Sequence, residues 1–101
     1  MSEYQNRAVR IQRESFPLEA HEMKRQMLSA ALQLFNSLGG SQEDAMALVR
    51  SLPSLGNHVG YEVGVVMFEL ARISHANDID IMQAAYNVLD AAVADGGWHA
   101  Q

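Results

Sequence analysis

The sequence predicts an all-α protein, a small four-helix bundle that we expect to be dimeric. Its apolar residues recur three and four positions apart, and no segment alternates apolar and polar residues as a half-buried strand would. Glycine pairs and a proline separate the periodic segments, at Gly39-Gly40, Pro53 and Gly96-Gly97. Short connections between helices of this length are typical of a bundle.

A chain of 101 residues with 49% hydrophobic and 19% charged residues has the composition of one globular domain. We assign residues 1–16 to a polar N-terminal arm, 17–96 to a single helical domain and 97–101 to a tail. There is no cysteine, which removes disulfides and thiolate metal sites and favours a reducing compartment, so we expect a cytoplasmic protein. No apolar leader follows a basic start, and no apolar run approaches about 18 residues, so we expect neither a signal peptide nor a membrane span.

The net charge of −5 is unevenly distributed. Residues 26–101 carry two basic and eight acidic side chains, whereas residues 1–25 carry five basic and four acidic ones. An acidic body argues against nucleic-acid binding and suits a cationic partner surface, or solubility alone. In the N-terminal arm, Arg7 and Arg10 fall on one face of a short helical segment over 3–14. There they would contact a phosphate or an acidic partner, unless the arm is simply solvated.

The first two bundle helices have clear start and stop signals. The first spans 18–38 and ends at Gly39-Gly40, because glycine accepts the left-handed conformation that follows many helices. The second spans 42–52, begins after Ser41 as its N-cap and ends before Pro53. Their apolar faces consist of Leu18, Met27, Leu28, Ala31, Leu32, Leu34, Phe35 and Leu38 in the first, and Ala45, Met46, Leu48, Val49 and Leu52 in the second.

The third helix, 57–76, is apolar around most of its circumference, and the fourth, 79–94, begins after an N-cap at Asp78 or Asp80. A helix that is apolar on nearly all sides is buried on nearly all sides. Four helices cannot easily surround one of their own number, so the spare apolar face predicts a second copy of the chain, most simply in a symmetric homodimer. The inner face predicted for the fourth helix consists of Ile81, Ala84, Ala85, Val88, Leu89 and Ala92.

Two glycines, Gly60 and Gly64, interrupt the third helix, and each costs about 1 kcal/mol relative to alanine in a helix interior. Some favourable interaction should offset that cost. We predict that another helix approaches closely over this face, within the chain or at a dimer interface, with Val63, Met67 and Phe68 packing around the glycines. The alternative is that a ligand or a metal occupies the space.

Glu62 and Glu69 are seven residues apart on the third helix, on one face with His58 and Arg72. The simplest interpretation is a solvated polar stripe in which Glu69 and Arg72 form a weak ion pair. In the alternative, these acids begin a site for a hard cation, which needs several oxygen ligands. The acids that the second helix could add are Glu43 and Asp44.

Three stretches in the second half of the chain carry apolar residues at a characteristic spacing, and the first and third of them also carry an acid: Glu62-Val-Gly-Val65-Val-Met-Phe, Leu70-Ala-Arg-Ile73, and Ile79-Asp80-Ile81 followed by Ala84. Over about residues 43–85 this spacing resembles the MazG-like all-α nucleotide pyrophosphatases. The resemblance implies a helical fold in which two glutamates on one helix and an ExxD pair on the next bind magnesium. In that family the magnesium holds the triphosphate of a nucleotide.

The acidic positions depart from the pattern of that family. Glu62 matches the first acid of the ExxD pair, but Val65 stands where the aspartate belongs. Glu43 matches one glutamate of the preceding helix, but Met46 stands in place of the other. With two of the four ligand positions apolar, the resemblance implies the fold without magnesium-dependent catalysis.

Other chemistry has little support in the sequence. There is no glycine-rich phosphate loop and no G-x-S-x-G nucleophile elbow. The four histidines lack the spacing of a zinc site. The first turns of the third helix carry no base-reading side chain, so nucleic-acid binding is not expected. Trp98 either contacts a partner or folds back to close the bundle.

We therefore predict a non-enzymatic protein without a cofactor that acts by binding another protein or complex. It would be a small regulator, adaptor or inhibitor, of the kind common in phages and mobile elements. Its candidate partner contacts are Arg7, Arg10 and Trp98. The alternative is a MazG-like magnesium-dependent pyrophosphatase with an altered site, and a further alternative is a structural subunit of a larger oligomer. The metal ligands of the pyrophosphatase would be Glu43, Asp44, Glu62 and Glu69.

Overall fold

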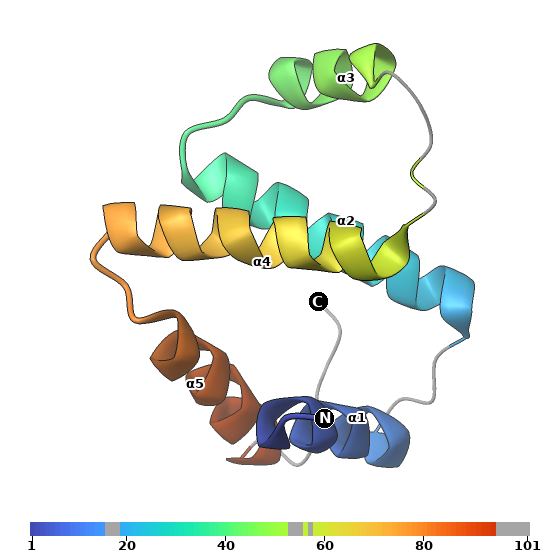
Figure 1. Ribbon diagram of the computed structural model, residues 1–101, viewed down its shortest axis with the longest axis vertical. Coiled ribbons are helices and arrows are strands. Elements are labelled where there is room, and N and C mark those ends of the chain that lie inside the picture. Colours follow the sequence, from blue (N-terminus) through green and yellow to red (C-terminus); the bar gives the residue numbers. More distant parts are fainter. Residues whose placement is uncertain (16–18, 53–55, 57, 95–101) are drawn as a thin grey trace. The chain divides into compact units, whose positions relative to one another are not determined.

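The computed structural model describes residues 1–15, 19–52, 56 and 58–94. In this part of the chain every regular element is a helix, so the predicted all-α class is confirmed. The four helices predicted over 18–38, 42–52, 57–76 and 79–94 each begin and end within two residues of an observed helix. The four-helix bundle and the dimer stay predictions. The helices are α1 (Glu3–Ser15), α2 (Ala20–Ser37), α3 (Gln42–Ser51), α4 (Val59–Ala76) and α5 (Ile81–Ala94), as Figure 1 shows.

Contacts between residues divide the chain into two units. The α1–α4–α5 unit comprises Met1–Pro17 and Gly56–Gln101, and the α2–α3 unit comprises Leu18–Leu55. The polar segment predicted to be helical over 3–14 is α1, and it packs on α5. The N-terminal arm is thus a helix that belongs with the second half of the chain.

The core of the α1–α4–α5 unit forms where α5 packs against α1 and α4. Leu89 and Ala92 of α5 are the buried apolar side chains of the described residues, only 6% and 4% exposed. From α1, Tyr4 and Ile11 lie two turns apart on the same helical face, and both are half-buried. The rings of Tyr4 and Tyr86 meet edge to face with their centroids 5.5 Å apart, an arrangement that aromatic pairs favour.

The inner face predicted for α5 is only partly right. Besides the two buried residues, Ile81 and Ala85 are half-buried, as expected. Ala84 and Val88 are exposed, because α1 and α4 cover one side of α5 and these two residues lie on its flank.

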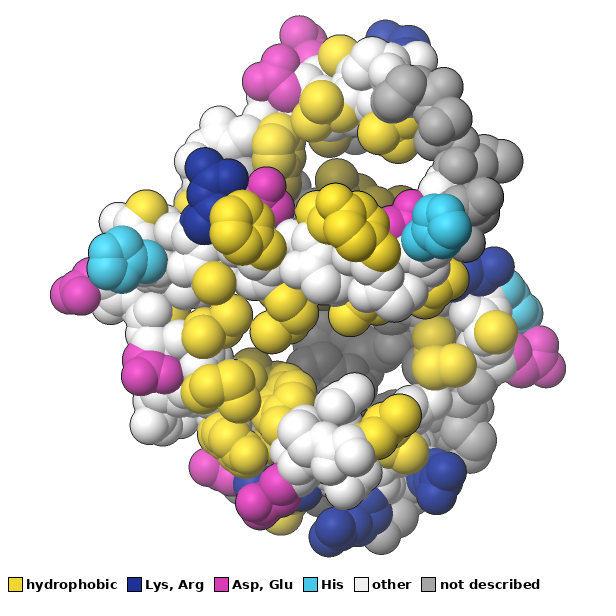
Figure 2. Space-filling view, viewed as in Figure 1, with side chains coloured by type: hydrophobic (Ala, Val, Ile, Leu, Met, Phe, Trp, Pro, Cys, Tyr) yellow, Lys and Arg dark blue, Asp and Glu magenta, His cyan; other side chains and the backbone are white. Residues whose placement is uncertain are grey.

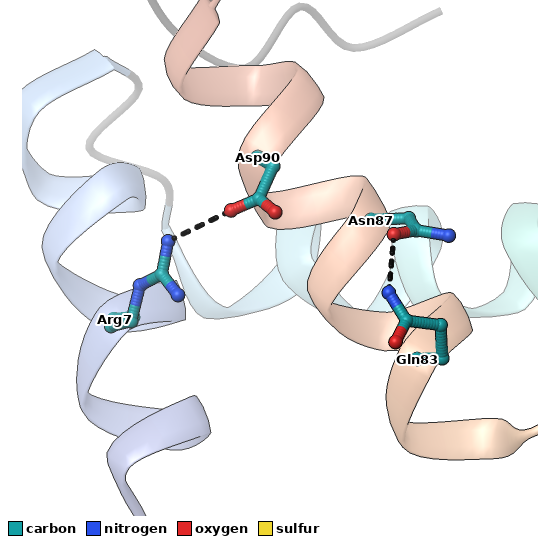
Figure 3. A network of polar contacts seen from close by, with 4 residues as sticks. All are labelled: Arg7, Gln83, Asn87 and Asp90. Carbon is teal, nitrogen blue, oxygen red and sulfur yellow. Dashed lines mark hydrogen bonds and ion pairs between the residues drawn. The ribbon is translucent and has the colours of Figure 1, made fainter.

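A polar contact fastens α1 to α5 (Figure 3). The Arg7 guanidinium lies 3.3 Å from the Asp90 carboxylate and 5.5 Å from the centroid of the Tyr86 ring, and its side chain is 28% exposed. A partly desolvated cation with both an ion-pair partner and an aromatic face is held more firmly than an exposed one. One turn apart on α5, the Gln83 side-chain amide donates to Asn87 Oδ1 at 2.9 Å.

Two aspartates define the turn between α4 and α5. Asp78 adopts φ +57°, and the next N–H, that of Ile79, donates to the Ser74 carbonyl at 2.8 Å, which closes the end of α4. Asp80 Oδ1 accepts a hydrogen bond from the Gln83 N–H at 2.9 Å. Of the two caps that the sequence allowed, Asp80 is therefore the N-cap of α5.

Candidate protein-binding surfaces

The α2–α3 unit contains an apolar groove with a volume of about 540 Å³ between its two helices. On α3 the lining residues recur at positions i, i+3, i+4, i+7 and i+8, which places them on one side of the helix. On α2 they are one turn apart. The groove is lined by Leu32 and Asn36 of α2 and by Gln42, Ala45, Met46, Val49 and Arg50 of α3.

The turn between the two helices sets this geometry. Gly39 adopts φ +95°, and the Gly40 N–H donates to the Phe35 carbonyl at 2.9 Å, so that α2 ends in a left-handed residue as predicted. The Phe35 ring covers Gly40 so closely that a Cβ at residue 40 would overlap the ring. Ser41 Oγ then accepts a hydrogen bond from the Asp44 N–H at 3.1 Å, which confirms Ser41 as the N-cap of α3.

The groove combines an apolar floor with polar groups at its edge. Leu32, Met46 and Val49 are 38%, 50% and 68% exposed, so neither helix of this unit buries them. Arg50 makes no ion pair with a described residue of its own unit and is exposed. This arrangement resembles the grooves that accept the apolar face of a partner helix.

The helix α4 carries a second candidate surface, and Figure 2 shows apolar side chains along it. Val63, Met67 and Phe68 are 57%, 49% and 61% exposed. The face that they share with Gly60 and Gly64 is open, because a Cβ built on either glycine meets no atom of the described α1–α4–α5 unit within 4 Å. The close helix approach predicted over these glycines is therefore not made inside this unit, and the dimer interface stays a prediction.

The two glutamates of α4 lie on its other side, and Arg72 lies between the two sides with its guanidinium 5.5 Å from the centroid of the Phe68 ring. Arg72 Nη1 is 3.1 Å from Glu69 Oε1, which confirms the predicted ion pair, although both side chains are more than half exposed and the pair contributes only a few tenths of a kcal/mol. The Glu62 carboxylate folds back against Gly56, where a negative charge is favoured by the positive end of the helix dipole.

The two glutamates of α4 do not converge on a common site. Glu62 and Glu69 are seven residues apart, which separates them by about 10 Å along the helix axis. Among the described residues of their unit, no third histidine or acid joins either carboxylate to form a group that could hold a metal. The remaining acids of the proposed metal set, Glu43 and Asp44, lie in the first turn of α3 in the α2–α3 unit.

The other predicted contact residues are dispersed. Arg7 is engaged by Asp90 and Tyr86, whereas Arg10 is exposed on α1. Trp98 lies outside the described residues. His58 precedes α4 without capping it through its side chain, and His75 lies in the last turn of α4. None of the described helices combines the length and apolarity that crossing a membrane requires.

Comparison with protein-family models, with curated proteins and with solved structures finds no match.

The groove of the α2–α3 unit was not anticipated as a site. From the sequence we predict that Leu32, Met46 and Val49 lie on apolar faces that point into the bundle and that other helices cover them. Two features of the sequence together could have indicated the groove. They are the tight Gly39-Gly40 turn between the helices and the polar residues at the edges of the apolar faces of α2 and α3. Which side chains line the groove depends on the angle between the helices, and periodicity does not give that angle.

Proposed function

We propose that the protein acts without catalysis, by binding another protein, and that it does so as a homodimer. In this role it is a small helical regulator, adaptor or inhibitor. The observation that supports the proposal most directly is the apolar groove between α2 and α3. Contact of the apolar groove with water raises the free energy of the protein, and a partner that covers the groove lowers it.

The chemistry of the groove favours an amphipathic helix as its occupant. Leu32 and Val49 offer apolar contact to residues spaced at i, i+3 and i+4 on such a helix. Met46 is unbranched and adapts to the shape of an incoming side chain. Arg50 at the edge favours a carboxylate on the partner, because opposite charges fix the orientation of the bound helix.

The homodimer is supported by the exposed apolar side chains of α4. Within its own unit, α4 leaves large apolar residues uncovered on several sides, among them Val59 at 74% and Tyr61 at 75% exposure. Exposed apolar side chains that lie next to one another in this way are rare on monomeric proteins and are typical of protein–protein interfaces.

We expect Met46→Glu to reduce capture of the partner from a native host extract by about tenfold or more. A carboxylate at residue 46 would be desolvated in the apolar groove, and a loss of about 1.4 kcal/mol already weakens binding tenfold. The measurement is quantitative mass spectrometry of proteins retained by the immobilised full chain. Ala47→Glu is the matched control, since Ala47 lies on the side of α3 away from the groove and receives the same charge.

Partners retained equally by all three chains would place the binding surface outside the groove. Two other results would contradict the proposed function itself. Magnesium-dependent release of pyrophosphate from nucleotides, abolished in Glu62→Gln, would establish the MazG-like alternative. Assemblies larger than a dimer in light scattering would establish the structural subunit.

A further inference from the structure

We propose that a second copy of this chain binds the Met67 face of α4, with the two α4 helices antiparallel and the two-fold axis passing between Gly64 and Met67. The Met67 face is the side of α4 formed by Gly60, Val63, Gly64, Met67, Phe68 and Ala71. This inference extends the proposed homodimer by naming its interface and orientation, and it does not involve the groove of the α2–α3 unit.

The first support is the amount of apolar surface on this side of α4. Val63, Met67 and Phe68, together with Val59 and Tyr61 on either side of Gly60, are between 49% and 75% exposed. At on the order of 100 Å² for each of these five side chains, two copies bury roughly 1,000 Å² between them, the area at which biological interfaces begin. The face is therefore large enough for a dimer that forms reversibly and depends on protein concentration.

The second support is the match between Gly64 and Met67 in the antiparallel register. An axis between Gly64 and Met67 places Gly64 opposite Met67 of the second copy. The same axis places Gly60 opposite Ala71 and Val63 opposite Phe68, so every pair occurs twice. Met67 fills the gap at Gly64, and the small pair of Gly60 and Ala71 lets the two backbones approach closely. The resulting dispersion contacts offset the helix-weakening cost of the glycines.

A parallel pairing lacks this match. It would set Gly64 against Gly64 and Met67 against Met67, which leaves gaps at the glycines and crowding at the methionines. It would also align the two helix dipoles in the same direction, whereas the antiparallel pair sets each positive helix start beside a negative helix end.

The third support is the position of the charges. At 100° per residue, Glu62 and Glu69 lie on the opposite side of α4 from the centre of the Met67 face, and Arg72 lies well to its flank. A second helix on this face therefore leaves both glutamates in water. Arg72, whose guanidinium lies 5.5 Å from the centroid of the Phe68 ring, stays at the edge of the interface. His75 lies on this side of α4 beyond Ala71, past the start of the antiparallel partner helix. The described residues of α1 and α5 leave the face uncovered at both glycines, so the unit itself does not compete for it.

Single cysteines test the orientation, because the chain has none of its own. In the antiparallel register the two copies of residue 67 are about 5 Å apart along the axis, whereas the two copies of residue 60, or of residue 71, are about 16 Å apart. A disulfide needs Cα atoms within about 7 Å. We expect oxidation to cross-link Met67→Cys to itself. Gly60→Cys and Ala71→Cys are expected to cross-link only when the two are mixed.

Glu69→Cys, on the charged side of α4, is the control and should stay uncross-linked. Circular dichroism of each variant before oxidation verifies that the helices are retained. Self-cross-linking of all three face variants would establish a parallel pair and overturn the proposal. Absence of any cross-link, or equal cross-linking of Glu69→Cys, would overturn it as well. None of these results affects the outcome expected for Met46→Glu in the groove. The experiments can therefore contradict the α4 interface without contradicting partner binding by the groove.

Discussion

Gly64→Leu is expected to convert the chain from a dimer to a monomer. A leucine at residue 64 would occupy the space that the antiparallel register gives to Met67 of the second copy, and overpacking of this kind costs about 1–3 kcal/mol per site. Two equivalent sites per dimer raise the dissociation constant by at least about 30-fold. The measurement is light scattering coupled to size exclusion over a range of protein concentrations.

The same substitution should strengthen the isolated helix, since leucine has a higher helix propensity than glycine by about 1 kcal/mol. Loss of the dimer with undiminished helicity therefore separates an interface effect from unfolding. Val65→Leu, which adds a methylene group away from the Met67 face, is the matched control and should stay dimeric. A Gly64→Leu chain that dimerises as tightly as the wild type would contradict an interface at this residue.

Leu89→Ala is expected to lower the free energy of opening the α1–α5 packing by about 2–3 kcal/mol. Leu89 is only 6% exposed, and truncation of a buried leucine removes its apolar contacts and leaves a cavity. The measurement is native-state hydrogen exchange of the α1 and α5 amides, which reports local opening directly.

Val88→Ala serves as the comparison for this experiment, because Val88 precedes Leu89 on the same helix but is 46% exposed. Its effect on exchange should be within about 0.5 kcal/mol, as for most exposed positions. Similar effects of the two substitutions would show that α1 and α5 do not pack around Leu89.

The ends of the helices could be predicted because local signals determine them. Gly39 takes the left-handed conformation that ends α2, and Ser41 caps α3 through the next turn, as the residue types indicated. The choice between Asp78 and Asp80 could not be made from sequence. Both residue types cap helices, and only the backbone shows that Asp78 closes α4 while Asp80 starts α5.

The packing of α1 on α5 could not be predicted, because it joins residues far apart in the chain. Arg7 and Asp90 are 83 positions apart, and no local pattern links them. The sequence predicts that Arg7 contacts a partner. In the structure, Arg7 forms an ion pair with Asp90 and a cation–π contact with the Tyr86 ring. Long-range pairing of this kind depends on the path of the whole chain.

Of the two candidate binding surfaces, one could be located from the sequence and the other could not. Residue type and helical spacing marked Gly60 and Gly64 as a place where another helix approaches closely, whereas the described residues of α1 and α5 leave both glycines uncovered. The groove beside Met46 was not visible, because its existence depends on how far apart α2 and α3 lie. The periodicity of apolar residues indicates which side chains face a neighbouring helix, but it does not give the distance to that helix.

We propose that a second copy of the chain covers the exposed apolar surface of α4. Sedimentation equilibrium of the wild-type protein at micromolar concentration tests it most directly. We expect a species of about 22 kDa, twice the 11.1 kDa of one chain, that dissociates on dilution. A single species of 11.1 kDa at every concentration up to the millimolar range would show that the chain does not dimerise through α4.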